Sequence, residues 1–135
     1  MSDSIEFDIS HTYSLFETGI TVPVTMTYAG ETEDLRAKID TGSSFCIFRR
    51  LHGNALGIEI ETGVPVVIGT ATSSFQVYGH EVVIHVLGIE LASIVYFAES
   101  DLFDRNVLGR SGWLNRIKLG LVEPEGKLFL STYRS

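Results

Sequence analysis

Apolar and polar residues alternate along most of this chain with the period of a β-strand. Residues 20–28 form the clearest run, in which Val22, Val24 and Met26 fall on one face. A glycine-containing turn then leads to a second run over residues 35–39. The two runs together predict a β-hairpin. We expect this hairpin to hold the residues that follow it in a fixed position.

The remaining alternating segments predict strands over residues 5–10, 64–68, 75–87, 89–97, 107–108, 117–122 and 127–130. Two segments have helical character instead. Residues 49–56 form a short helical turn closed by Gly57, and a second short helical segment is expected onward from Arg110. The pattern as a whole predicts an all-β fold with little helix.

Length and charge narrow the class of protein. At 135 residues, we treat 1–135 as a single domain, with its core between about residues 20 and 130. The chain has 10 basic and 17 acidic residues, a net charge of −7. This balance argues against nucleic acid or an anionic membrane surface as the main partner.

The single cysteine and the N-terminal residues indicate the cellular compartment in which the protein is expected. Cys46 is the single cysteine, so it forms no internal disulfide, and its apolar surroundings favour a buried thiol over a nucleophile. The chain opens without a basic region, and no apolar run approaches the ~18 residues of a membrane helix. We therefore expect a soluble, cytoplasmic protein.

One stretch, residues 37–48, combines reactive side chains with a tight turn. Asp40, Thr41, Gly42 and Ser43 lie there between two apolar runs. A glycine two residues after a carboxylate lets the backbone turn sharply and brings amide N–H groups near the acid. The two hydroxyl groups can donate to the carboxylate or to a facing backbone group, and a hydrogen bond to the charged carboxylate would lower its pKa. An ordinary surface turn uses the same residue types, so this tetrapeptide alone leaves both interpretations open.

A second loop contains only small residues: Gly69, Thr70, Ala71, Thr72, Ser73 and Ser74. It connects two predicted strands, and an ordinary hairpin loop would explain it. A loop of small residues also suits a closing lid, because it changes backbone conformation easily and can approach a peptide closely.

Five apolar residues near these loops have two possible roles: Phe45, Ile47, Val67, Ile68 and Val107. They suit the core or the wall of an apolar cleft. The histidines do not suggest a metal site. His80 and His85 are five residues apart in a predicted strand, which points them to opposite faces, and His11 and His52 add no cluster. We expect neither a metal nor a cofactor.

The order of these pieces resembles one lobe of an aspartic protease. Asp40-Thr41-Gly42-Ser43 follows an apolar strand, the small-residue loop comes about 30 residues later, and Val107-Leu108-Gly109-Arg110 precedes a short helical segment. The length is similar to that of the retropepsins, the homodimeric retroviral-protease-like enzymes. The resemblance implies a single-lobe acid-protease β-barrel with a flap hairpin and one short C-terminal helix.

The resemblance assigns a role to each residue of the first loop. Asp40 matches the catalytic aspartate, which pairs with its symmetry mate from a second subunit. Thr41 matches the threonine whose hydroxyl crosses the dimer axis, and Gly42 the glycine whose carbonyl accepts a hydrogen bond from the substrate. Ser43 stands where a hydroxyl can bond the outer oxygen of Asp40, so Ser43→Ala is expected to move the acid limb of the pH–rate profile upward.

The other two motifs also have family counterparts. Gly69 to Ser74 would be the flap, and Val107-Leu108-Gly109 the segment that packs under the active-site loop. Arg110 completes the Gly-Arg motif, but Ser44 stands where viral members carry the acidic partner of this arginine. Arg110 therefore needs a different partner. The terminal segments are also longer than in the viral proteins, which leaves the strands of the dimer interface open.

These features predict a homodimeric aspartic endopeptidase that hydrolyses peptide or protein substrates with one Asp40 from each subunit. The alternative is a non-catalytic dimerisation or peptide-binding module on the same fold, since fold does not guarantee activity. An unrelated β-barrel with a chance turn motif is a third interpretation. Asp40→Asn separates the first two interpretations: it should abolish cleavage if the chain is a protease and leave binding largely intact if the chain is a binding module.

Overall fold

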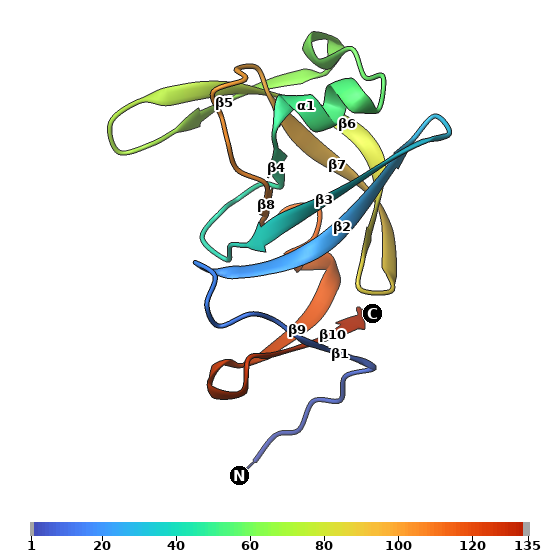
Figure 1. The fold of residues 1–135 in the computed structure, drawn as a ribbon, viewed down its shortest axis with the longest axis vertical. Coiled ribbons are helices and arrows are strands. Elements are labelled where there is room, and N and C mark those ends of the chain that lie inside the picture. The colour runs from blue at the N-terminus through green and yellow to red at the C-terminus, as the bar shows by residue number, and fades with distance from the viewer. Residues whose placement is uncertain (1, 134–135) are drawn as a thin grey trace.

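The computed structural model describes residues 2–133 and is built almost entirely of β-strands (Figure 1). The strands are β1 (Ile9–Thr12), β2 (Ile20–Tyr28), β3 (Glu31–Ile39), β4 (Ile47–Phe48), β5 (Val64–Gly69), β6 (Ser74–Val86), β7 (Ile89–Ala98), β8 (Val107–Leu108), β9 (Ile117–Val122) and β10 (Lys127–Thr132). Helix α1 (Arg50–Ala55) and the 3-10 turns η1 (Ile60–Thr62), η2 (Leu114–Arg116) and η3 (Glu123–Glu125) complete the described elements. The all-β prediction is confirmed.

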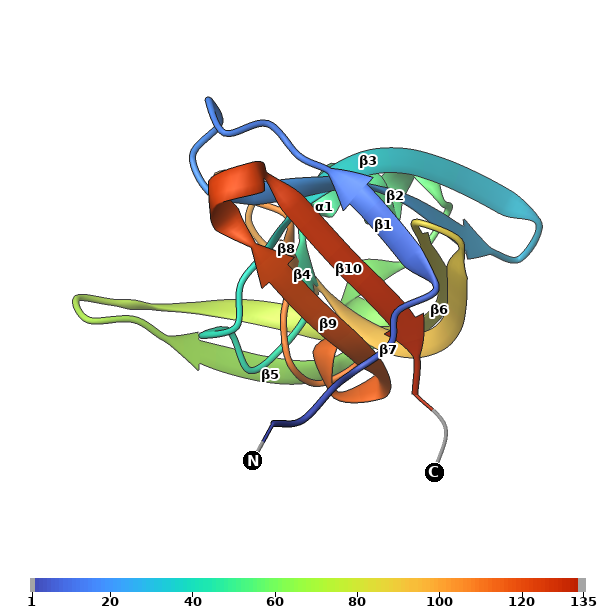
Figure 2. The ribbon, with the colours of Figure 1, turned by 90° about the horizontal axis from the view of Figure 1, so that it is seen from below.

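The strands form two sheets. Seven strands lie in the order β2-β3-β8-β4-β7-β6-β5, and an additional pairing of β2 with β6 curls this sheet toward a barrel. The other sheet, β1-β10-β9, lies across one end of it (Figures 1 and 2). The N-terminal strand therefore pairs with the C-terminal strand of its own chain.

The predicted first hairpin forms with the expected faces. Strands β2 and β3 pair antiparallel, and Val22, Val24 and Met26 are almost completely buried. Hydrophobic burial of this one face stabilises the hairpin and sets its register, because a shift of one residue would expose all three side chains. The register brings β3 to its end at Ile39, immediately before Asp40.

The helical segments are shorter than the sequence suggests. Helix α1 covers Arg50–Ala55, and the predicted glycine follows its C-cap: Gly57 has a φ of 77°, which favours glycine. The segment expected after Arg110 is a single 3-10 turn, η2. Gly112 has a φ of 100°, and the chain is already extended again at Ile117 to begin β9, so no room remains for a longer helix.

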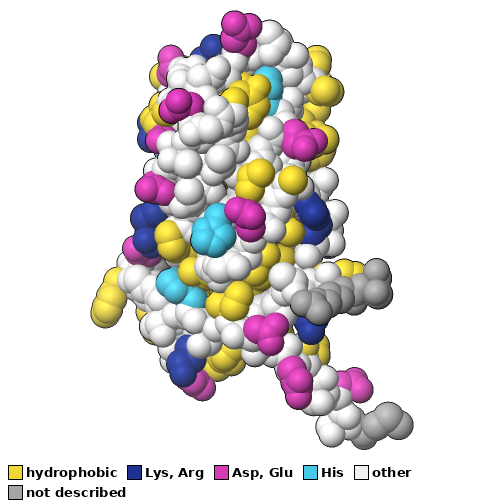
Figure 3. Space-filling view, turned by 90° about the vertical axis from the view of Figure 1, so that its right-hand side faces the viewer, with side chains coloured by type: hydrophobic (Ala, Val, Ile, Leu, Met, Phe, Trp, Pro, Cys, Tyr) yellow, Lys and Arg dark blue, Asp and Glu magenta, His cyan; other side chains and the backbone are white. Residues whose placement is uncertain are grey.

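The surface carries charges of both signs. Acidic, basic and apolar side chains are interspersed over the face shown in Figure 3. Within residues 2–133, no helix has the length and apolar character that would let it cross a membrane.

Candidate active site

Asp40 stands at the end of β3, where a neighbouring strand holds its backbone. Strand β8 runs parallel to β3 with Ile39 opposite Leu108. The backbone N–H of Asp40 donates to the carbonyl of Leu108 at 3.0 Å. The sheet therefore fixes the point at which the acidic loop leaves it.

The loop itself is a tight turn with the carboxylate on the outside. The backbone N–H of Ser43 donates to the Asp40 carbonyl at 3.1 Å, and the N–H of Gly42 donates to Asp40 Oδ1 at 2.9 Å. Asp40, Thr41 and Gly42 are all exposed in the single chain. This arrangement presents one oriented carboxylate to solvent, or to whatever covers the loop.

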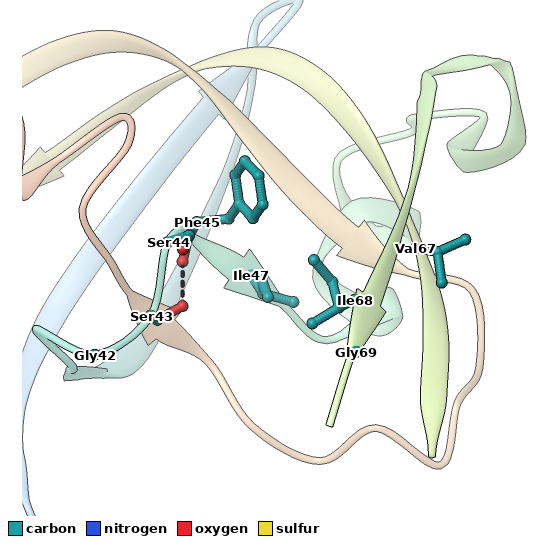
Figure 4. A pocket seen from close by; sticks show the side chains of 8 residues that line it. All are labelled: Gly42, Ser43, Ser44, Phe45, Ile47, Val67, Ile68 and Gly69. Carbon is teal, nitrogen blue, oxygen red and sulfur yellow. Dashed lines mark hydrogen bonds between the residues drawn. The ribbon is translucent and has the colours of Figure 1, made fainter. Parts of the chain in front are cut away.

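The Ser43 hydroxyl does not donate a hydrogen bond to the Asp40 carboxylate. Ser43 Oγ donates to the carbonyl of Phe45 at 2.7 Å (Figure 4). A hydroxyl has one proton to donate, so the Ser43–Asp40 hydrogen bond expected from the sequence is not formed in this chain. Ser43 instead bonds a backbone carbonyl two residues further along the chain and thereby stabilises the shape of the loop.

The segment after β8 supports the loop from below. Arg110 N–H donates to the Ser43 carbonyl and Ser111 N–H to the Ser44 carbonyl, both at 2.9 Å. A Cβ atom at Gly109 would lie 2.2 Å from the carbonyl oxygen of Phe45, so the close approach requires glycine. The segment from Gly109 to Ser111 therefore lies directly against the backbone of residues 43–45. The Arg110 side chain is exposed and has no ion pair within residues 2–133.

Cys46 lies beneath the loop as a buried thiol. Its Sγ is 3.8 Å from the Gly109 carbonyl and 3.6 Å from that of Ser111. Burial raises the pKa of Cys46 to about 11. The thiol therefore stays protonated at neutral pH and is a poor nucleophile, as the sequence suggested.

Two of the cavities that adjoin the loop extend to the hairpin between β5 and β6. The first, of about 300 Å³, is lined by Gly42, Ser43, Ser44, Phe45, Ile47, Val67, Ile68 and Gly69 (Figure 4). The second, of about 170 Å³, contains the carboxylate and is lined by Asp40, Ser43, Ile47, Ile68, Thr70, Phe75, Phe103, Arg105 and Val107. Each of the five apolar residues with two possible roles lines at least one cavity, and Ile47 and Val107 are also part of the buried core. Ile47 and Val107 therefore serve both purposes, whereas Phe45, Val67 and Ile68 line cavities without being part of the buried core.

The small-residue loop forms the tip of the hairpin between β5 and β6, which projects from the barrel (Figure 1). Gly69 lines the first cavity and Thr70 the second. Ala71 to Ser74 are exposed and line neither. The bonds in the tip are local, with Thr70 N–H donating to the Ser73 carbonyl at 2.8 Å.

Sequence reasoning missed one wall of the Asp40 cavity. Phe75 and Phe103 stack with ring centroids 5.0 Å apart, and the Arg105 guanidinium lies 6.0 Å from the Phe103 ring. Residues 99–106 have the composition of a polar loop, so sequence reasoning did not assign them to a site. The available signal was the placement of an aromatic and a cation just before the Val107 motif.

Asn106 is a second residue that the sequence did not reveal. Its Oδ1 accepts from Arg49 N–H at 2.9 Å and its Nδ2 donates to the Arg36 carbonyl at 3.0 Å. Nδ2 also lies 3.0 Å from His52 Nε2, while His52 Nδ1 contacts Glu33 at 2.8 Å. Asn106 thereby connects β3, α1 and the chain entering β8.

His80 and His85, which the sequence places five residues apart, differ in their surroundings. His80 is half-buried, with Nε2 2.8 Å from the Ile60 carbonyl, whereas His85 is exposed. Residues 2–133 contain no group of three or more His, Cys, Asp or Glu side chains placed to hold a metal ion.

The fold is similar to that of known aspartic proteases. A retropepsin-like aspartic protease from Rickettsia conorii matches with a TM-score of 0.65 and 16% identity, over 91% of this chain and 97% of that one. The EIAV protease in complex with the inhibitor HBY-793 matches with a TM-score of 0.54 and 21% identity, over 72% of this chain and 86% of that one. No protein-family model matches the sequence, and neither does any curated protein. The chain therefore has the retropepsin-like fold, as its motifs suggested.

Proposed function

We propose that this chain is an aspartic endopeptidase that works as a homodimer, with one Asp40 from each subunit. The observation that carries the proposal is the placement of Asp40: an exposed carboxylate on a loop fixed by β8, beside a partly apolar cavity, in a retropepsin-like fold. The two structural neighbours named above are aspartic proteases, which supports the reaction class.

The chemistry explains why a second subunit is needed. Two carboxylates ~3 Å apart repel by about 5 kcal/mol at an effective dielectric constant near 20, which corresponds to roughly 4 pKa units. The pair therefore shares one proton. The ionised member removes a proton from water, the protonated member donates to the scissile carbonyl, and no covalent intermediate forms. The apparent pKa values belong to the pair rather than to either Asp40.

The surroundings of the loop suit a partner. The Thr41 hydroxyl is exposed and forms no hydrogen bond to any residue from 2 to 133, and it lines a cavity with Arg110, Leu114 and Asn115. A second copy would give both Thr41 and Arg110 polar partners. The hairpin tip at 69–74 would act as the flap, with Gly69 and Thr70 closest to substrate.

The test is digestion of a mixed peptide library between about pH 4 and pH 7 at tens of micromolar protein. Asp40→Asn is expected to lower kcat/KM by roughly 10³-fold or more, because it removes the shared proton and the general base. Asp34→Asn is the matched control: it removes the same charge from the same hairpin, where Asp34 bonds only Thr25 among residues 2–133.

Sedimentation of both variants accompanies the digestion. Two chains bring a charge of −14 together, so moderate salt is expected to favour the dimer. Cleavage by wild type and Asp34→Asn but not by dimeric Asp40→Asn supports the aspartic mechanism. A folded dimer that binds peptides and cleaves none contradicts it and favours the binding module.

A further inference from the structure

Basic side chains gather at one edge of the cleft. Arg105 lines the Asp40 cavity and also an adjoining cavity of about 260 Å³. Arg36, Lys38 and Arg49 also line this adjoining cavity, and Asp104 is the one acidic residue in its lining. Four of the chain's 10 basic residues thus surround one hollow in a protein whose net charge is −7. We call these four residues the basic edge.

The positive charge of the basic edge is largely free of internal partners. Arg36 lies 3.6 Å from Glu17, but both side chains are about half exposed, so solvent weakens the pair. Arg105 forms no ion pair within residues 2–133 and contacts the face of Phe103 instead. Arg49 Nε is buried and has no hydrogen-bond partner in the described part of the chain. A buried donor without a partner is costly unless a ligand accepts its hydrogen bond.

The shape and charge of the two cavities favour a carboxylate ligand with an apolar stem. An arginine fork matches the two oxygens of a carboxylate. In the Asp40 cavity, the rings of Phe75 and Phe103 supply an apolar surface next to Arg105. Asp40 would repel an acidic side chain there, and the guanidinium of Arg105 is the group in the lining that offsets this repulsion.

We propose that the basic edge selects substrates with acidic side chains next to the cut bond. Arg105 is the specificity-determining residue for a glutamate or aspartate in the Asp40 cavity. Arg36, Lys38 and Arg49 receive a further carboxylate of the same peptide in the adjoining cavity. This inference rests on the proposed protease function and names its substrate class.

The test compares two peptide libraries that carry either glutamate or glutamine at the positions flanking the cut bond. At about pH 6, where glutamate is ionised, wild type is expected to show roughly tenfold higher kcat/KM on the glutamate library, the scale of one charge-assisted hydrogen bond. Arg105→Glu is expected to reverse this preference. The matched control is Lys127→Glu, which makes the same charge change at an exposed position on β10 and should keep it.

The relative cleavage of the two libraries, and not total activity, distinguishes a specificity role of Arg105 from a structural one. A merely structural role for Arg105 would lower cleavage of both libraries equally, and that result overturns the inference. Equal cleavage of both libraries by wild type also overturns it. In wild type, the glutamate preference should weaken as pH falls through about 4.3, where glutamate becomes neutral.

A binding measurement keeps the two proposals apart. A labelled peptide with two central glutamates and its glutamine counterpart are titrated into wild type, Asp40→Asn and Arg105→Glu, with fluorescence anisotropy as the readout. Tighter binding of the glutamate peptide to wild type and Asp40→Asn, lost in Arg105→Glu, supports the basic edge even if no variant cleaves. Equal affinities for both peptides contradict it even if cleavage is confirmed.

Discussion

The Asp40 loop and the hairpin tip at 69–74 face the same cavity but are held very differently. The Asp40 loop bonds to β8 and to residues 109–111 through backbone groups, and a buried thiol packs beneath it. The hairpin tip is exposed at every position, and its bonds join Thr70 to Ser73 within the tip itself.

This contrast matches what each part has to do in the proposed enzyme. A catalytic carboxylate must be held within a fraction of an ångström, so its loop needs long-range backbone support. A segment that admits and covers a substrate must change conformation at low cost, so it needs few contacts. The same chain supplies both kinds of segment around one cavity.

A pair of glycine substitutions gives the largest expected contrast in stability. Gly109→Ala places a Cβ 2.2 Å from the Phe45 carbonyl oxygen and is expected to lower the free energy of unfolding by about 3 kcal/mol. Gly69→Ala in the hairpin meets no atom within 4 Å and is expected to change it by less than about 0.5 kcal/mol. Urea unfolding measures both. Equal losses would mean that the loop is not supported as described.

Cys46 provides a pH-dependent test of the same contrast. The thiol's pKa rises from 9.0 to about 11 on folding, so the unfolded chain loses its proton first. The stabilisation is complete below about pH 9 and disappears as pH rises toward 11, a loss of roughly 2–3 kcal/mol. Urea unfolding of wild type and Cys46→Ala across this range isolates the effect, since other titrating groups are common to both. Parallel curves would contradict a buried, protonated thiol.

The smallest expected effect on the free energy of unfolding comes from two hydroxyl groups, each of which donates to a backbone carbonyl a few residues away. Ser43→Ala removes the partly buried bond to the Phe45 carbonyl and is expected to cost about 1 kcal/mol. Thr70→Ala removes a 2.9 Å bond to the Ser73 carbonyl in the exposed tip and should cost less than about 0.5 kcal/mol. Because Ser43 does not donate to Asp40, we now expect Ser43→Ala to leave the acid limb of the pH–rate profile unchanged. An upward shift would restore the interpretation based on sequence.

Local sequence patterns predicted most of the strands. Alternation defined β2 to the residue, and the turn after Leu87 and the end of α1 at Gly57 also follow from short-range rules. The N-terminal strand was placed too early: β1 begins at Ile9, because Asp8 N–H donates to the Ser131 hydroxyl and not to a backbone ladder. A side-chain acceptor 123 residues away leaves no local signal.

By itself, the sequence determined the strand-rich class, the position of Asp40 at the end of a hairpin and the separation of the two motifs. These properties depend on periodicity and turn chemistry within a few neighbouring residues. Only the tertiary structure decided which acceptor the Ser43 proton takes, and which residues surround Asp40. The cavity wall combines Ile68, Phe75 and Arg105 from separate segments, and such neighbours are set by how the sheet curls and packs.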